Sequence, residues 1–271
     1  MDLSQDPRVM AAVAAHDELT AVEHHTEVGS TNDVVLQRLR SGSPPGLVVV
    51  ADRQTAGRGR RGRRWIDDLH GPDGPANLAV TVALEAGGPR PGRVPLAAGL
   101  AVRAAVGNQG VDAVLKWPND VLVPTPTGQE AKLAGILCEQ HRLNGREVVL
   151  IGCGVNLDWR GIERDTTSAR WTSLAEHLGA PVDRARLLAD LLDRLPVEVA
   201  AARAGSQAHL SGYAAACATL GRRVRVERTA APAVVGHAIA VDPDGQLVVR
   251  TAAGEVTVAA GDTTHLRAEP S

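Results

Sequence analysis

The stretch "GLVVVADRQTAGRGRRGRRW", residues 46–65, runs from an apolar segment into a loop that is dense in glycine and arginine. The apolar part predicts a buried strand that ends in the loop. Gly57, Gly59 and Gly62 spell the G-x-G-x-x-G of a dinucleotide-binding turn. Five arginines occupy the positions between and after these glycines. The loop is therefore either a cofactor turn, a basic patch for nucleic acid, or a site for another anion.

The residues after the loop exclude a dinucleotide-binding turn. Such a turn opens a helix, because the pyrophosphate sits on the N-terminus of that helix. Residues 66–77 contain two Gly-Pro-type turn signals and no apolar period of 3.6 residues. The glycines of a cofactor turn also allow close packing, which leaves no room for five arginines. The loop therefore has a different function.

Six arginines lie within residues 53–64 of a chain whose net charge is only −2. Such a cluster repels itself unless an anion fills it, and the glycines add free backbone N–H groups that can bind phosphate or carboxylate. Binding of nucleic acid would favour interleaved aromatic residues, but the chain has no Phe and one Tyr, and only Trp65 lies nearby. A small polyanion such as ATP is the favoured ligand.

Composition sets the class of protein. The 271 residues are 44% hydrophobic and 22% charged, which is typical of a globular protein with one large domain or one large and one small. No apolar run approaches the ~20 residues of a membrane span, and the N-terminus lacks a signal-peptide pattern. Three widely spaced cysteines predict a reducing cytoplasm, and neither they nor the histidines show metal-ligand spacing.

Only two of the 29 basic residues are lysines. Lys116 begins "KWPND" and Lys132 begins "KLAGILCE". A lysine at the end of a strand is usually an exposed surface residue with no specific function. In a chain that otherwise uses arginine, a retained lysine favours a position where a compact ammonium group is needed.

Periodicity and turn residues predict the other elements. A helix is expected over 29–42, with Ser30 and Asp33 as a capping box, followed by a strand over 77–85 and a buried helix over 95–110. Two short strands broken at Pro118 precede a hairpin over 131–157 that turns at Asn144-Gly145. Helical patterns fill 171–217. In "IGCGVN", the alternation places Gly152, Gly154 and Asn156 on one face for a ligand and Cys153 on the other.

From about residue 220, short alternating strands predict a small all-β module of ~50 residues, about the size of an SH3-like barrel. Taken in order, "GSTN", "ADRQTAGRGRRGRRW", "LKWPNDVL", "KLAGILCE", "GCGVNL" and "GDTTHLR" resemble the biotin–protein ligases. The resemblance spans roughly residues 26–267. It implies an α/β (α+β) fold, a mixed sheet with flanking helices like the core of class II aminoacyl-tRNA synthetases. The implied domains are an N-terminal extension at 1–25, a catalytic domain at 26–218 and the SH3-like domain at 219–271.

The resemblance also implies the chemistry. ATP activates biotin as biotinyl-5′-AMP, and a lysine of a biotin carboxyl carrier protein then accepts the biotin. The implied catalytic residues are Lys132, Arg58 and Asp120. The implied biotin-binding residues are Ser30, Thr31, Asn32, Gln54, Gly57, Arg58, Gly59, Arg60, Trp65, Lys132 and Gly135. The implied ATP-binding residues are Arg58, Arg61, Arg63, Lys116, Asn119, Lys132, Asn156, Trp171 and Arg267.

Within these roles, Mg²⁺ is expected to neutralise the polyphosphate, and Asp120 either holds metal or orients the acceptor lysine. Only ~25 residues precede the ligase-like region, so binding to a DNA operator is not expected, and the protein is expected to be a monomer or homodimer. Residues 66–77 and 123–131 look longer than the family pattern. The alternatives are a lipoate–protein ligase, which would need an elongated apolar channel, and a nucleic-acid-binding module that uses the basic loop.

Overall fold

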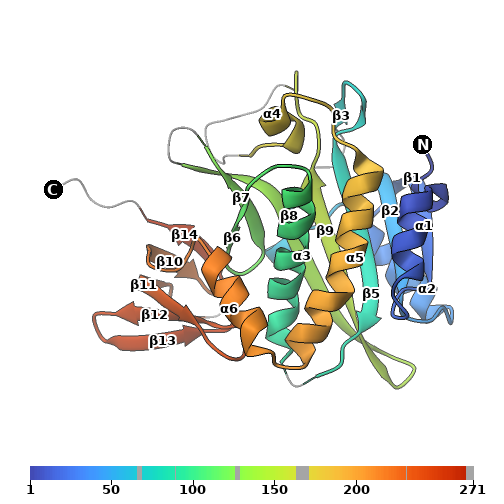
Figure 1. Ribbon diagram of the computed structural model, residues 1–271. Coiled ribbons are helices and arrows are strands. Elements are labelled where there is room, and N and C mark those ends of the chain that lie inside the picture. The colour runs from blue at the N-terminus through green and yellow to red at the C-terminus, as the bar shows by residue number, and fades with distance from the viewer. Residues whose placement is uncertain (66–68, 89, 126–128, 163–170, 230, 267–271) are drawn as a thin grey trace.

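The computed structural model describes residues 1–65, 69–88, 90–125, 129–162, 171–229 and 231–266. A seven-stranded mixed sheet forms its centre (Figure 1). β1 and β2 are parallel, and every other pair of neighbours is antiparallel. In spatial order the strands are β1 (Ala21–Val28), β2 (Leu47–Gln54), β5 (Asn77–Glu85), β9 (Arg146–Asn156), β8 (Glu130–Leu143), β7 (Asp120–Pro124) and β6 (Val114–Lys116).

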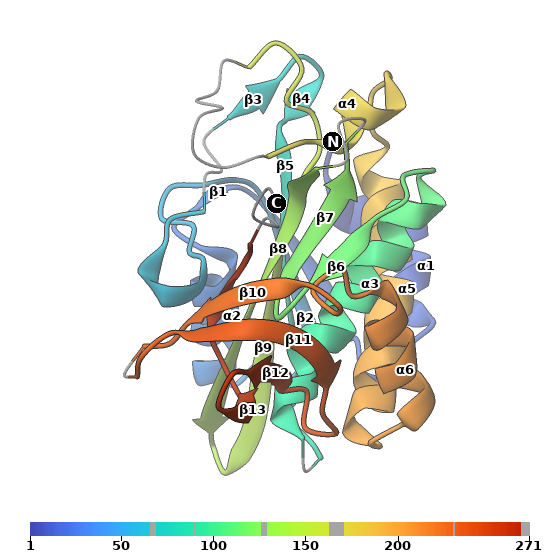
Figure 2. The ribbon, with the colours of Figure 1, turned by 90° about the vertical axis from the view of Figure 1, so that its left-hand side faces the viewer.

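Helices cover both faces of this sheet. α3 (Val94–Asn108) and α5 (Arg184–Arg203) pack together on one face, and α1 (Pro7–Ala14) packs on α5. α2 (Thr31–Arg40) lies on the opposite face (Figure 2), where Val35 and Leu39 pack on residues of β2, β5 and β9. The remaining helices are α4 (Leu174–Leu178), α6 (Gln207–Ala216) and the 3₁₀ turns Leu3–Gln5, Arg60–Gly62 and Pro91–Arg93; β3 (His70–Gly71) and β4 (Gly74–Pro75) form a small hairpin.

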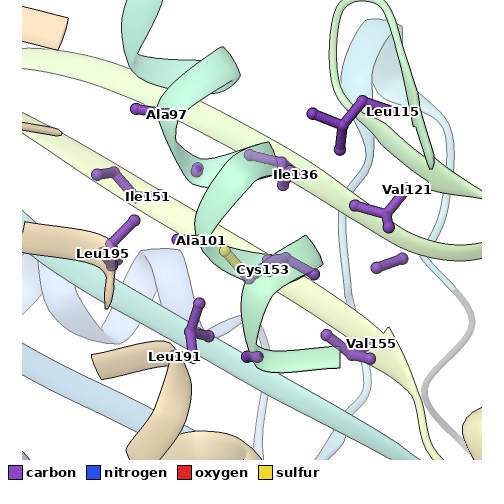
Figure 3. Packing of buried hydrophobic residues seen from close by; sticks show 14 of the residues in the cluster. Ala97, Ala101, Leu115, Val121, Ile136, Ile151, Cys153, Val155, Leu191 and Leu195 are labelled. Carbon is purple, nitrogen blue, oxygen red and sulfur yellow. The ribbon is translucent and has the colours of Figure 1, made fainter. Parts of the chain in front are cut away.

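The main core lies between α3, α5 and the strands β8 and β9. α3 is buried because its sheet-facing positions are alanine and glycine, which let the helix approach the strands closely. Figure 3 shows Ala97 and Ala101 of α3 among Ile136, Ile151 and Leu195. Cys153 lies in this core, as its strand alternation predicted, and burial raises the pKa of its thiol to about 12.

Local sequence signals place most elements correctly. The β8–β9 hairpin turns at Asn144 and Gly145, whose φ angles of 51° and 78° suit a type I′ turn. The capping box expected at α2 is wrong, because Ser30 makes no side-chain cap hydrogen bond. The Thr31 N–H donates instead to Gln54 Oε1 at 2.8 Å. Asp33 pairs with Arg58.

The segment before residue 25 is integrated with the sheet. Leu3, Val9 and Val13 are buried in the main core, and Arg8 forms an ion pair with Asp183 at the start of α5. β1 runs through the expected boundary at residue 25 without interruption. The N-terminal segment therefore contributes hydrophobic contacts to the same core as the rest of the sheet.

The C-terminal strands form a second, five-stranded antiparallel sheet at the left of Figure 1. Its order is β13 (Gly254–Val258), β12 (Leu247–Thr251), β11 (Val234–Val241), β10 (Arg223–Glu227) and β14 (Asp262–His265). Trp117 joins it to the main body: its backbone N–H donates to Thr219 Oγ1 and its indole N–H to the Gly245 carbonyl, both at 3.0 Å. Among the described residues, no helix is both long and apolar enough to cross a membrane.

Trp117→Phe is expected to lower the free energy of unfolding by about 1–3 kcal/mol, because it removes a buried hydrogen bond to Gly245 and leaves a small cavity. The Trp117 side chain is 1% exposed. Urea unfolding followed by far-UV circular dichroism measures the change. Val235→Ala on the exposed face of β11 is the control, and equal stability of the two variants would contradict this role.

Candidate active site

A cleft opens where the N-terminus of α2, the arginine-rich loop and the strands β7, β8 and β9 meet. The residues that line it come from eight separate stretches of sequence, which the fold brings together. Among the residues expected from sequence, the lining includes Ser30, Thr31, Asn32, Gln54, Arg58, Gly59, Arg60, Arg63, Trp65, Asn119, Asp120, Lys132, Gly135 and Trp171.

The arginine-rich loop, residues 57–65, is a small hairpin over this cleft. The Trp65 N–H donates to the Gly57 carbonyl at 2.9 Å, and the Gly59 N–H donates to the Arg63 carbonyl at 2.6 Å. The tip turns through Arg61 and Gly62, both with positive φ. The glycines therefore form a tight reversal and start no α-helix, which agrees with the exclusion of a dinucleotide turn.

Arg58 and Arg60 differ in how their charge is balanced. Arg58 binds both carboxylate oxygens of Asp33, at 2.6 and 2.8 Å, and these hydrogen bonds raise the pKa of its guanidinium. Among the described residues, Arg60 donates to neutral oxygens, the Asn119 amide and the Gly261 carbonyl, both at 3.1 Å, and to no carboxylate. Burial lowers the pKa of Arg60, and the nearby charges of Asp120 and Asp262 only partly oppose this effect.

The tip of the loop contacts the C-terminal sheet. Arg63 forms an ion pair with Asp262 at 2.7 Å, and Arg61 donates to the Glu227 carbonyl at 3.4 Å. Arg60 adds its bond to Gly261. These three contacts attach the loop to the ends of β10 and β14, so the cleft is bounded by both sheets.

Asp262→Asn is expected to increase tryptic cleavage of the loop up to about fivefold, because an exposed ion pair contributes up to about 1 kcal/mol. The loop carries five arginines, so trypsin followed by mass spectrometry reports its release directly. Glu255→Gln removes an ion pair with Arg250 elsewhere in the same sheet and is the control. An unchanged cleavage rate in Asp262→Asn would show that the backbone contacts alone hold the loop.

One end of the cleft is a polar cluster at the N-terminus of α2. Gln54 Oε1 accepts from the Thr31 N–H and lies 3.1 Å from Thr31 Oγ1. The hydroxyl of Thr81 on β5 lies 2.8 Å from Thr31 Oγ1 and 2.6 Å from Asn32 Oδ1. The Asn32 amide N–H donates to Glu139 at 2.6 Å. Hydrogen-bonding groups therefore line this end of the cleft.

Sequence reasoning missed Thr81 and Glu139. Thr81 is the one polar residue within the buried run 78–84 of "NLAVTVALE", and that interruption was the available signal. Glu139 closes the motif "KLAGILCE", but its contact with Asn32 joins residues 107 positions apart. No local pattern indicates such a contact.

The two lysines converge on one carboxylate. Lys132 Nζ lies 2.6 Å from Asp120 Oδ1, and Lys116 Nζ lies 3.8 Å from Asp120 Oδ2. Lys132 Nζ also lies 5.1 Å from the ring centroid of Trp171, within cation–π range. The ammonium group of Lys132 thus lies at the cleft, and Asp120 holds it in position.

Gly135 and Gly154 leave room for Trp65 on the sheet. A Cβ on Gly154 would overlap the Trp65 ring, and one on Gly135 would lie 3.2 Å from it. Trp65 in turn meets Trp171 edge-on, with centroids 6.0 Å apart, and Trp171 stacks on Trp159. The glycine face expected from alternation is therefore present, and in this structure an indole covers it.

Four expected site residues lie outside the cleft lining: Gly57, Arg61, Lys116 and Asn156. Asn156 is fully buried and its amide donates to the carbonyls of Lys132 and Thr172, at 3.3 and 2.8 Å. Its Oδ1 is buried and has no hydrogen-bond partner among the described residues. Arg267 lies outside the described residues.

Comparison with known proteins identifies the family of this chain. The Biotin/lipoate A/B protein ligase family matches residues 26–156, and the Biotin protein ligase C terminal domain matches residues 219–265. The biotin--[acetyl-CoA-carboxylase] ligase of Mycobacterium tuberculosis is 35% identical over 89% of this chain and 87% of its own length. The chain belongs to the biotin protein ligase family. It is an enzyme of this type.

Two further biotin protein ligases support this assignment to the family. The biotin--[acetyl-CoA-carboxylase] ligase of Paracoccus denitrificans is 32% identical over 86% of this chain and 95% of its own length. A biotin protein ligase from Aquifex aeolicus, solved in complex with biotin and ATP, has a TM-score of 0.73 and 26% identity, covering 91% of this ligase and 99% of that chain. The expected fold, a mixed sheet with flanking helices and a C-terminal β domain, is confirmed.

Proposed function

We propose that this ligase adenylates biotin and transfers it to a lysine of a biotin carboxyl carrier protein, and that the residues of the cleft bind both substrates. In the first step a carboxylate oxygen of biotin attacks the α-phosphorus of ATP, and the bond to the β-phosphate oxygen breaks to release pyrophosphate. In the second, the acceptor amine attacks the carbonyl carbon of the mixed anhydride. AMP leaves, and the amine loses a proton as the amide forms.

The polar end of the cleft supports biotin over lipoate. A ureido ring offers two N–H donors and a carbonyl acceptor, and the polar groups of Ser30, Thr31, Asn32 and Gln54 line that end of the cleft, with Thr81 bonded behind them. Lipoate would need an elongated apolar channel, which polar groups at this end do not provide. The biotin roles of Ser30, Thr31, Asn32 and Gln54 rest on this match.

The charged end supports the adenylation step. The first step brings a carboxylate and a polyphosphate together, so it requires dense positive charge that is already in place. Lys132 and Arg60 are the cations best placed to supply it, and Arg58 and Arg63 line the same cleft. Trp65 covers the glycine face where the ligand would lie, and its buried indole N–H has no partner in the part of the chain that the structure describes.

Mg²⁺ would enter with the ATP. The described residues contain no group of three His, Cys, Asp or Glu side chains that could hold a metal ion. Asp120, the one candidate from sequence, is already bonded to Lys132 and faces Lys116. These contacts favour Asp120 as the residue that orients Lys132, and the phosphate oxygens of ATP as the main ligands of the ion.

The arginines favour this function over nucleic-acid binding. Arg58, Arg60, Arg61 and Arg63 turn toward Asp33, Asn119, Glu227 and Asp262 of the same chain. Arg58, Arg61 and Arg63 are exposed, but each already bonds an oxygen of the same chain, whereas a basic surface for nucleic acid would leave such groups unpaired for phosphates. Cytoplasmic residence is part of the proposal, supported by three cysteines that are all free thiols.

The test is a reconstituted reaction with ATP, Mg²⁺, an apo biotin carboxyl carrier domain, and either biotin or lipoate. Transfer of biotin, detected by intact mass, is expected, together with release of AMP and pyrophosphate. A carrier that gains lipoate and no biotin would overturn the assignment. A carrier variant with Arg in place of the acceptor lysine is the matched control.

A further inference from the structure

We infer that Glu139 is a positioning residue that sets which hydrogen-bonding face Asn32 presents to the ureido ring. The inference rests on the proposed function. Glu139 does not line the cleft, and its side chain is 31% exposed. Asn32, in contrast, is 4% exposed and lies in the cleft wall. Glu139 therefore acts on the ligand through Asn32.

The contact fixes the orientation of the amide. An ionised carboxylate only accepts hydrogen bonds, so at 2.6 Å it must face the NH₂ group of Asn32. The Thr81 hydroxyl on the other side can donate or accept and would tolerate either orientation. Glu139 is thus the partner that turns the Asn32 oxygen inward, toward Thr81 and the backbone of Gly152. This oxygen lies so close to Gly152 that a Cβ added to the glycine would be 2.5 Å from it.

Pairing with Arg58 explains the charge of Glu139 less well than the contact with Asn32 does. Asp33 already binds both terminal nitrogens of Arg58, at 2.6 and 2.8 Å, while Glu139 lies 3.4 Å from one of them. A second carboxylate beside Arg58 also opposes the binding of anionic substrates. Neutralising Arg58 therefore does not account for Glu139, whereas orienting Asn32 does.

This role of Glu139 predicts an effect on the binding of biotin and none on the binding of ATP. An acceptor at Asn32 Oδ1 suits an N–H donor of the ureido ring, and loss of the carboxylate lets the amide turn and present a donor there instead. Glu139→Gln retains the size of the side chain but can face Asn32 with either its oxygen or its NH₂ group. The binding of biotin is expected to weaken while the binding of ATP does not.

The experiment measures biotin affinity by calorimetry and the KM of both substrates in adenylate formation. Glu139→Gln is expected to weaken biotin binding about tenfold, the scale of one mismatched buried hydrogen bond. The KM for ATP should stay within about twofold, since the contact of Glu139 with Asn32, at 2.6 Å, is much shorter than its 3.4 Å contact with Arg58, which Asp33 already pairs. Glu139→Asp retains a carboxylate acceptor on a shorter side chain, so its biotin affinity should lie between those of the wild type and Glu139→Gln. Glu147→Gln, an exposed residue on β9, is the matched control.

A double-mutant cycle with Asn32→Ala separates positioning from a general effect. In the Asn32→Ala background, Glu139→Gln should change biotin affinity less than about twofold, because the residue it positions is gone. An equal effect in both backgrounds would overturn the inference, as would a Glu139→Gln variant with wild-type biotin affinity. Failure of the wild-type protein to adenylate biotin would refute the proposed function instead. If Glu139→Gln does not fold, Glu139→Asp is carried through the same cycle.

Discussion

Lys132→Ala is expected to lower the rate of adenylate formation about 100- to 1,000-fold, the loss typical when one preorganised charge on a developing anion is removed. Lys132 is one of only two lysines in the chain, and its ammonium group lies in the cleft 2.6 Å from Asp120. The variant also leaves Asp120 unpaired, which adds a repulsive charge beside the phosphates. Pyrophosphate release, measured with saturating biotin and ATP, reports the rate.

Arg142→Ala is the matched control for Lys132, because it removes a positive charge from an exposed position on the same strand, β8. Its rate should equal that of the wild type. Lys132→Arg is expected to recover only part of the lost rate, since a planar guanidinium cannot replace a compact ammonium beside Trp171. A Lys132→Ala variant with more than about a tenth of the wild-type rate would contradict a role in the transition state.

Arg60→Ala is expected to lower adenylation more than Arg58→Ala does, about 100-fold against about tenfold. Arg58 is neutralised by Asp33, whereas the partners of Arg60 are neutral oxygens. An arginine that is buried without a carboxylate partner has the larger unbalanced charge to offer an incoming anion. Steady-state kinetics on both variants, with each substrate varied in turn, measures the two losses.

Arg225→Ala on β10 is the control for these variants, since it removes an exposed arginine whose partner is Glu227. Loss in Arg60→Ala should appear in kcat for adenylation. Loss in Arg58→Ala should appear mainly in the KM for biotin. Equal losses, or a larger loss in Arg58→Ala, would show that the resident carboxylates do not determine which arginine meets the anion.

Much of the fold was predictable because its signals are local. Apolar runs mark β5 and β9, Asn144-Gly145 marks the hairpin turn, and apolar residues on nearly every side mark α3 as a buried helix. The alternation in "IGCGVN" correctly separated Cys153, in the core, from the glycines that face the cleft. Each of these features depends on residues that are neighbours in the chain.

Other features required the tertiary structure. The N-terminal segment was expected to be an extension, but Leu3 and Val9 complete the core under α5. The capping box does not form because the Asp33 N–H donates to the Ser30 carbonyl and the Asp33 carboxylate pairs with Arg58, 25 residues away. Such partners compete with local motifs only after the chain has folded.

The candidate site likewise has features that the sequence predicted and features that only the tertiary structure decided. Composition alone singled out the arginine-rich loop and Lys132, because charge density and residue bias can be read without coordinates. What the sequence could not decide is how each charge is balanced. Arg58 is bonded to Asp33 and Arg63 to Asp262, whereas Arg60 is bonded to no carboxylate among the described residues and only lies near Asp120 and Asp262. It also could not place Glu139 against Asn32. Hydrogen bonds and ion pairs act over a few ångströms, so these pairings exist only where the sheet order brings distant segments together.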